Sequence, residues 1–175
     1  MSSRAHEVAD ALFDRHAAVF GADLPVYRGH VHRVIGLVEH QVGVPAAAAD
    51  AFGTAAFFHD AGIWFDHTWD YLPPSTRRAV DALADPTQAD LVTALIGEHH
   101  RLRPARHPDP LVEAMRRADL TDITAGLVGC PGVPRSAFRA LAAEYPDAGF
   151  RPMLLRAFGR GLREAPWRPA PMLKL

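Results

Sequence analysis

The adjacent pair His59-Asp60 closes an apolar run that ends in Phe57-Phe58. An imidazole and a carboxylate are both good ligands for hard or borderline divalent metals. Burial of this pair behind two phenylalanines would be costly unless a positive group lay between the two side chains. On a helix, Phe52 and His59 share one face, so His59 is expected to point into the core. The pair therefore indicates a metal site whose other ligands come from elsewhere in the chain.

Three further ligand-type side chains occupy positions where the helical pattern predicts leucine or valine. His30 lies one position before the apolar stripe of its helix, His99 ends the stripe of a later helix, and Asp119 lies on the inward side of the next one. Each of them alone is more simply a core or boundary group whose hydrogen bonds are satisfied. Together with His59 they put such groups on four successive helices, which favours a shared site.

The elements that must position these groups are all predicted to be helices. Apolar residues recur at helical spacing, as in the stripe Val31, Val34, Ile35 and Val38, and no alternating strand pattern of useful length occurs. Asp85-Pro86 and Asp109-Pro110 each place an N-cap residue before a proline at the first helical position. The predicted helices cover residues 5–20, 27–42, 46–60, 76–84, 135–144 and 150–163, and two more begin at Pro86 and Pro110.

The expected fold is therefore all-α, a helical bundle formed as a single domain over residues 1–175, a length that allows a substantial core. Residues 63–75 are predicted to be an irregular, aromatic loop. Residues 165–175 contain three prolines and are expected to lie extended over the body of the protein.

Composition narrows the function classes. Hydrophobic residues make up 49% and charged residues 22% of the chain, as in ordinary globular proteins. The formal charge of −1 and the pI of about 6.8 give no electrostatic signal for binding a nucleic acid polymer. Cys130 is the single cysteine, so it cannot form an internal disulfide. Because signal-peptide and membrane-spanning patterns are also missing, we expect a cytoplasmic protein with no membrane partner.

The order His, His-Asp, Asp resembles the signature of the HD-domain superfamily, from about Tyr27 to Asp122. The matching pieces are Tyr27-Arg28-Gly29-His30-Val31-His32-Arg33-Val34, His59-Asp60 and Arg117-Ala118-Asp119, and residues 62–72 are similar to one bacterial subgroup. The resemblance implies a bundle of helices around a divalent metal ion bound by His30, His59, Asp60 and Asp119. Most members of this superfamily are phosphohydrolases, so the implied substrate is a nucleotide or another small phosphate ester.

The residue chemistry agrees with that ligand set, because two neutral imidazoles and two carboxylates neutralise a +2 ion and leave coordination positions for water and substrate. Manganese, iron, nickel, zinc and magnesium all suit it. One ion is expected and two are allowed.

Further residues are expected to act around the ion. His99 is expected to be an acid/base catalyst or a ligand of a second metal, and Asp66 a general base. The expected substrate contacts are His100, His67, Arg33 and Trp64. Asp122, three residues after Asp119, is expected to orient a ligand histidine.

Each of these residues also has a simpler interpretation. His99 and His100 could be helix-end histidines favoured by the helix dipole, and Asp66 could cap a turn. Arg33 could form a surface ion pair, and Trp64 could pack in the core.

Other functions than phosphate-ester hydrolysis are also compatible with these residues. Some HD proteins hold two irons and oxidise a substrate with oxygen, and others are lyases or hydratases; the diiron version would need His99 or His67 for a second site. A non-catalytic binding module, in which a metal merely ties the helices together, is a third hypothesis. The expected partner is in each enzymatic case a small molecule, and a homodimer is left open.

Overall fold

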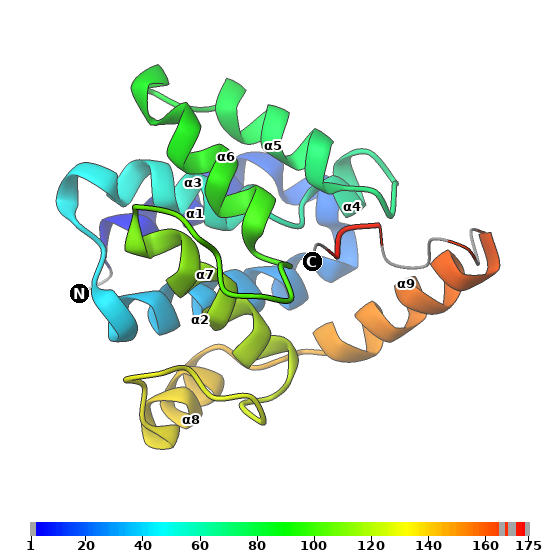
Figure 1. Cartoon of the computed structure of the whole chain (residues 1–175). Coiled ribbons are helices and arrows are strands. Elements are labelled where there is room, and N and C mark those ends of the chain that lie inside the picture. Colours follow the sequence, from blue (N-terminus) through cyan, green and yellow to red (C-terminus); the bar gives the residue numbers. More distant parts are fainter. Residues whose placement is uncertain (1–2, 165–166, 168–170, 174–175) are drawn as a thin grey trace.

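The computed structural model describes residues 3–164, 167 and 171–173, and every regular element in this part of the chain is helical (Figure 1). The α-helices are α1 (Arg4–Phe20), α2 (Leu24–Val42), α3 (Ala49–Phe58), α4 (Gly62–Phe65), α5 (Leu72–Asp81), α6 (Ala89–Glu98), α7 (Pro110–Ile123), α8 (Arg135–Glu144) and α9 (Phe150–Glu164). Short 3-10 turns at Gly21–Asp23, Ala46–Ala48 and Pro86–Gln88 lead into α2, α3 and α6. The prediction of an all-α bundle is confirmed.

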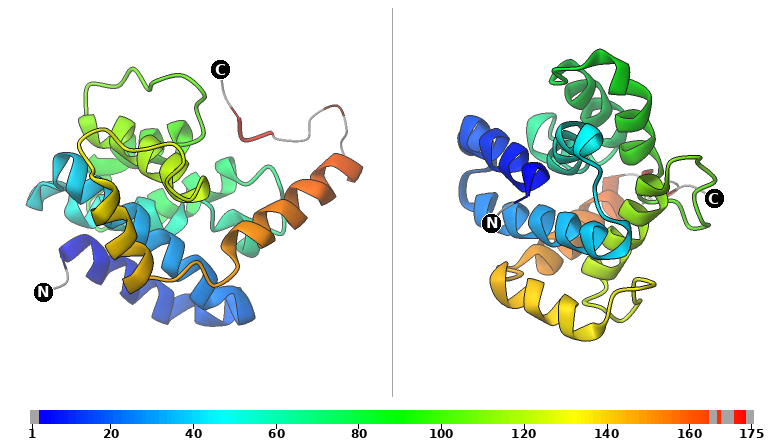
Figure 2. Two further views of the ribbon diagram at one scale, coloured as in Figure 1. Left: turned by 90° about the horizontal axis from the view of Figure 1, so that it is seen from below. Right: turned by 90° about the vertical axis from the view of Figure 1, so that its left-hand side faces the viewer.

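The core forms where the predicted apolar stripes meet. α1 packs against α3, α2 packs against α7, and α6 lies against α3, α5 and α7 (Figure 2). The stripe Val31, Val34, Ile35 and Val38 on α2 is fully buried. Burial of each such side chain stabilises the fold by about 1.5–3 kcal/mol. These contacts hold α2, α3, α6 and α7 in a fixed arrangement, and those are the helices that carry or precede the ligand-type residues.

Helix α3 ends earlier than expected. It stops at Phe58 instead of Asp60, because the hydrogen-bond pattern changes there. The N–H of His59 still donates to the carbonyl oxygen of Ala55 (2.9 Å), as in an α-helix, whereas the N–H of Ala61 donates to that of Phe58 (3.0 Å), which closes a tighter turn. Gly62 therefore begins α4 and does not cap α3. A Cβ atom at Gly62 would lie 2.8 Å from the carbonyl oxygen of Tyr71, so glycine allows the aromatic segment to pack closely here.

The aromatic segment 63–75 is more regular than predicted. It contains most of α4 and the first turn of α5, which begins at Leu72 instead of Thr76. Pro73 and Pro74 lie in that first turn, where a missing N–H removes no helical hydrogen bond. The two predicted N-caps are confirmed: Asp85 accepts from Thr87 N–H and Asp109 from Leu111 N–H, both at 2.9 Å.

The C-terminal part leaves the body of the bundle. α8 contacts α2, and α9 starts at α2 and then leads away from the body (Figures 1 and 2). The predicted extended tail, residues 165–175, falls largely outside the described residues; of its described part, Met172 is buried. Within the described residues, no helix combines the length and the hydrophobicity that crossing a bilayer requires.

Candidate metal centre

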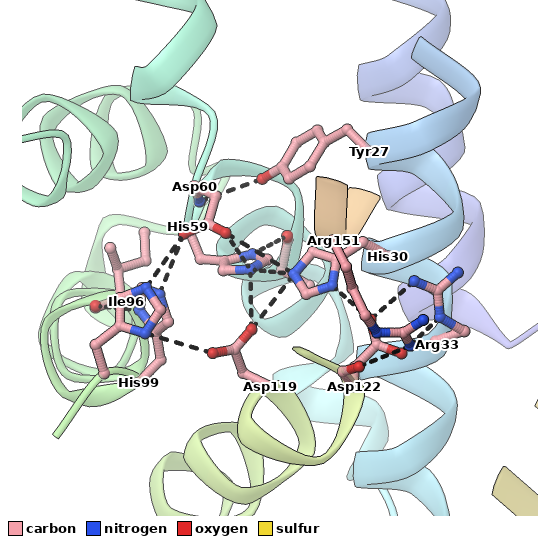
Figure 3. Close-up of polar contacts among 12 residues, drawn as sticks. Tyr27, His30, Arg33, His59, Asp60, Ile96, His99, Asp119, Asp122 and Arg151 are labelled. Atoms are coloured by element: carbon pink, nitrogen blue, oxygen red, sulfur yellow. Dashed lines mark hydrogen bonds and ion pairs between the residues drawn. The ribbon is translucent and has the colours of Figure 1, made fainter. Parts of the chain in front are cut away.

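Four side chains that are far apart in the sequence meet inside the bundle. His30 comes from α2, His59 and Asp60 from the turn after α3, and Asp119 from α7 (Figure 3). One ligand atom of each lies within 4.8 Å of the others, and the four residues are at most 2% exposed. The predicted convergence of these residues is confirmed, and the resulting buried cluster could hold a metal ion.

Hydrogen bonds on the far side of each ring direct the two histidines into the cluster. His59 Nδ1–H donates to the carbonyl oxygen of Ala56 at 2.7 Å, and His30 Nδ1–H donates to Asp122 Oδ2 at 2.8 Å. The two Nε2 atoms therefore face each other, 3.0 Å apart. With both rings neutral, two lone pairs would meet there, so the arrangement requires either a proton or a cation between them.

Asp119 supplies the clearest sign of a cation. Its carboxylate is 1% exposed, and neither oxygen accepts a hydrogen bond from a described residue. Oδ1 lies 3.4 Å from His30 Nε2, and Oδ2 lies 3.5 Å from His100 Nδ1. A buried carboxylate without hydrogen bonds is costly unless a positive charge compensates it. The donor set of two imidazoles and two carboxylates therefore fits a divalent ion.

The pKa values in the cluster reflect burial opposed by close charges. Burial alone would lower the pKa of His30, but Asp119 and Asp122 raise it to about 9. Burial lowers the pKa of His59 to about 4. Burial would raise the pKa of the Asp60 and Asp119 carboxyls, but the surrounding histidines hold both below their usual values. Without a metal ion, these pKa values favour a protonated His30 and a neutral His59 at neutral pH.

A second group of ligand-type atoms shares Asp60 with the first. It consists of Asp60, His99 and His100. His99 Nδ1–H donates to the Ile96 carbonyl oxygen at 2.7 Å, which leaves Nε2 directed at Asp60 Oδ1, 3.3 Å away. His100 Nε2 lies 3.7 Å from the same oxygen. The structure therefore brings His99 and His100 to the metal centre, on the side of Asp60 away from His30.

Arg33 and Asp122 form a buried support behind His30. Arg33 Nε and Nη2 bind the two Asp122 oxygens at 2.6 and 2.8 Å, and Nη1 donates to the carbonyl oxygens of Tyr145 and Pro146. Arg33 is 1% exposed, so its guanidinium is engaged within the protein and does not face an open surface. Asp122 has a pKa of about 2, because His30 and Arg33 outweigh its burial. Asp122 therefore lies where it can orient His30, the candidate ligand.

Like Arg33, three more of the sequence-predicted residues lie outside both ligand groups. Asp66 is paired with Arg78 at 2.9 and 3.0 Å, and His67 is exposed with a φ of 49°. The indole N–H of Trp64 donates to Asp23 at 3.0 Å, and its ring packs 4.6 Å from that of Tyr27. The structure thus engages Asp66 and Trp64 in contacts within the fold.

Three aromatic residues support the site without having been predicted to do so. Tyr27 OH donates to the Phe57 carbonyl oxygen (2.7 Å) and accepts from Asp60 N–H (3.2 Å). The hydroxyl of Tyr71 lies 2.6 Å from His100 Nε2. The ring of Phe150 stacks on His30 at 4.0 Å. The position of Tyr27, one helical turn before His30, is a signal that was available in the sequence; Tyr71 and Phe150 have no such local signal.

Comparisons of the chain with protein-family models, with curated proteins and with solved structures found no match.

Proposed function

We propose that this chain is a metal-dependent hydrolase of the HD superfamily. Its proposed substrate is a nucleotide or another small phosphate ester. The observation that carries the proposal is Asp119, a buried carboxylate without hydrogen bonds at the point where His30, His59 and Asp60 converge. A cytoplasmic location belongs to the same proposal, since Cys130 is a free thiol.

Each ligand residue has a defined task in this proposal. His30, His59, Asp60 and Asp119 would hold the ion, with the two Nε2 atoms aimed by the acceptors on Nδ1. A divalent ion held there would lower the pKa of a bound water and polarise a phosphoryl oxygen. Burial of the four residues keeps bulk water out and strengthens every charge interaction within the cluster.

His100 is the residue best placed to meet an anionic substrate. Its side chain is 14% exposed, whereas the side chains of Asp60, His99 and Asp119 are at most 3% exposed. Burial would lower the pKa of His100, but Asp60 and Asp119 raise it, which favours the protonated ring. A protonated His100 would attract a phosphoryl group to the side of the cluster from which the site is accessible. His99, enclosed beside Asp60, would be an acid/base catalyst or a ligand of a second ion.

The test is metal-dependent release of inorganic phosphate. The metal-free protein is loaded in turn with manganese, iron, nickel, zinc and magnesium, and assayed with nucleoside phosphates and sugar phosphates. We expect release with at least one ion, and a loss of at least about 100-fold in Asp60→Asn, because the substitution keeps the shape of the side chain and removes its charge. Asp90→Asn, the same change at an exposed position on α6, should retain full activity.

Two results would contradict the proposal. One is full activity in Asp60→Asn. The other is the absence of phosphate release from every substrate by protein that elemental analysis shows to be metal-loaded.

A second candidate function, oxygen-dependent oxidation at a pair of irons, is favoured by one observation: Asp60 belongs to both ligand groups. Under this alternative, elemental analysis gives about two irons per chain, and His99→Ala lowers that number to about one. Oxygen consumption with a small-molecule substrate would accompany it. A single redox-inert ion whose content is unchanged in His99→Ala would exclude it.

A further inference from the structure

The exposed apolar side chains of this protein are concentrated at its C-terminal end. Of the ten large hydrophobic residues that are exposed in the described structure, five lie between residues 155 and 173. Three of them are on α9: Leu155 is 72% exposed, Phe158 40% and Leu162 43%. The start of α9 contacts α2, and the helix then leads away from the body of the bundle (Figure 2). A contiguous apolar face of this kind marks an interaction surface.

The spacing of these residues is that of a helix-pairing seam. Leu155, Phe158 and Leu162 follow one another at intervals of three and four residues, the alternation of the a and d positions in a two-helix coiled coil. The positions that would flank the seam, e and g, are Gly159 and Gly161. A Cβ atom built at Gly159 would meet nothing within 4 Å, so the approach to the seam is open.

The exposed arginines of α9 leave the seam free for a second helix. Arg156 and Arg163 are exposed and fall at the b positions, away from the seam. Two copies of α9 could therefore meet along the seam without bringing these arginines together.

The distribution of charge over the whole chain favours a second copy as the partner. Residues 150–175 contain six of the nineteen basic and one of the twenty acidic residues, so they carry a net charge of +5 and residues 1–149 carry −6. In an antiparallel pair, the C-terminal half of each α9 extends towards the body of the other protomer. The basic segment of one copy would then lie near the acidic body of its partner.

We propose that two copies of this chain form a two-fold symmetric homodimer through an antiparallel pair of α9 helices, with Leu155, Phe158 and Leu162 in the seam. The same face is used by both protomers, as a closed two-fold interface requires. In this arrangement Leu155 of one protomer faces Leu162 of the other, and the two Phe158 side chains meet near the axis.

Sedimentation velocity of the full chain at protein concentrations of about 1–100 μM tests the interface. A specific dimer should form at or below about 100 μM, which sets the upper limit. We expect twice the monomer mass of 19.1 kDa for the wild-type chain, and the monomer mass for Leu155→Glu/Phe158→Glu. The matched control is Leu127→Glu/Val128→Glu, the same kind of change at two exposed apolar positions outside α9, which should remain dimeric. Circular dichroism and thermal unfolding check that the variants keep the fold.

A crosslinking experiment gives a second, independent measurement. Phe158→Cys should form a disulfide-linked dimer on mild oxidation, whereas Arg156→Cys should not, and the native Cys130 is buried. A wild-type chain that is monomeric up to 100 μM would overturn the proposal, and its binding to vesicles of anionic lipid would then assign α9 to a membrane surface. A dimer that persists in Leu155→Glu/Phe158→Glu, with no crosslink through position 158, would also overturn it.

Discussion

Asp122 Oδ2 accepts a hydrogen bond of 2.8 Å from His30 Nδ1, so a carboxylate on α7 determines which nitrogen of a histidine on α2 faces His59 and Asp119. Arg33, also on α2, holds the same carboxylate through two nitrogens. All three residues are at most 1% exposed. The orientation of His30 is thus set by a buried salt bridge between the two helices.

Asp122→Asn should weaken metal binding while leaving the ligand residues in place. The asparagine amide lacks the negative charge of Asp122, which pairs with Arg33 and holds the proton of His30 on Nδ1. Loss of such a partner typically lowers metal affinity by about 10- to 100-fold. Isothermal titration calorimetry of the metal-free protein measures the change. Asp90→Asn is the matched control at an exposed position. An affinity within twofold of the wild-type value would show that Asp122 does not support the ligand.

Metal binding should become stronger as the pH rises from 6 to 8. In the metal-free protein the pKa of His30 is about 9, so His30 carries a proton throughout this range and must release it to the solvent when it binds an ion. His59, with a pKa of about 4, is already neutral and contributes no proton. The His30 step therefore increases the apparent affinity by up to about tenfold per pH unit. Titrations in buffers of different ionisation enthalpy should detect this release of about one proton; an affinity independent of pH would contradict it.

Tyr71→Phe and Tyr27→Phe should have different effects, although each removes one hydroxyl from a fully buried ring. The Tyr71 hydroxyl contacts His100, so its loss should lower phosphate release by roughly fivefold, the equivalent of a hydrogen bond of about 1 kcal/mol, at unchanged metal content. The Tyr27 hydroxyl bonds to the backbone of Phe57 and Asp60, so its loss should lower the free energy of unfolding by about 1–3 kcal/mol. Equal effects of both variants on turnover would rule out a specific role for Tyr71.

Glu113→Gln should destabilise the protein more at neutral pH than at low pH. The Glu113 carboxylate accepts from the backbone N–H of Ala105 and pairs with Arg116 and Arg117. Burial would raise its pKa, but these partners hold it at about 2, below the ordinary value of 4.5. A depressed pKa contributes stability above pH 4.5, and that contribution is lost as the pH falls towards 2.

Urea unfolding at pH 7 and at pH 3 measures this difference. Because Glu113 is partly exposed, we expect a loss of roughly 1 kcal/mol or less at pH 7, and a smaller one at pH 3. Glu7→Gln, at an exposed position on α1, should have little effect at either pH. A difference that stays constant between the two pH values would mean that the charge of Glu113 is not the cause.

The sequence by itself determined the helical architecture and the inward direction of the candidate ligand residues. The stripe on α2 buries Val31, Val34 and Ile35, and that periodicity also directs His30 inwards. Asp85 and Asp109 cap their helices as local chemistry predicts. These features depend on neighbours within a few residues, and for that reason they can be read from the chain. Whether an ion occupies the cluster, and which reaction follows, stay predictions.

Only the tertiary structure decided how the site is supported and which polar residues surround it. Arg33 binds Asp122 across 89 residues of sequence and Tyr71 meets His100 across 29, and no local pattern specifies such pairs. Asp66 was a plausible general base by its position near His59-Asp60, yet α5 presents Arg78 to it. The close approach of Gly62 to the Tyr71 carbonyl oxygen, which leaves no room for a Cβ atom, joins segments nine residues apart. Contacts of this kind arise from the packing of whole helices against one another, so they follow from the assembled fold and not from the spacing of residues along the chain.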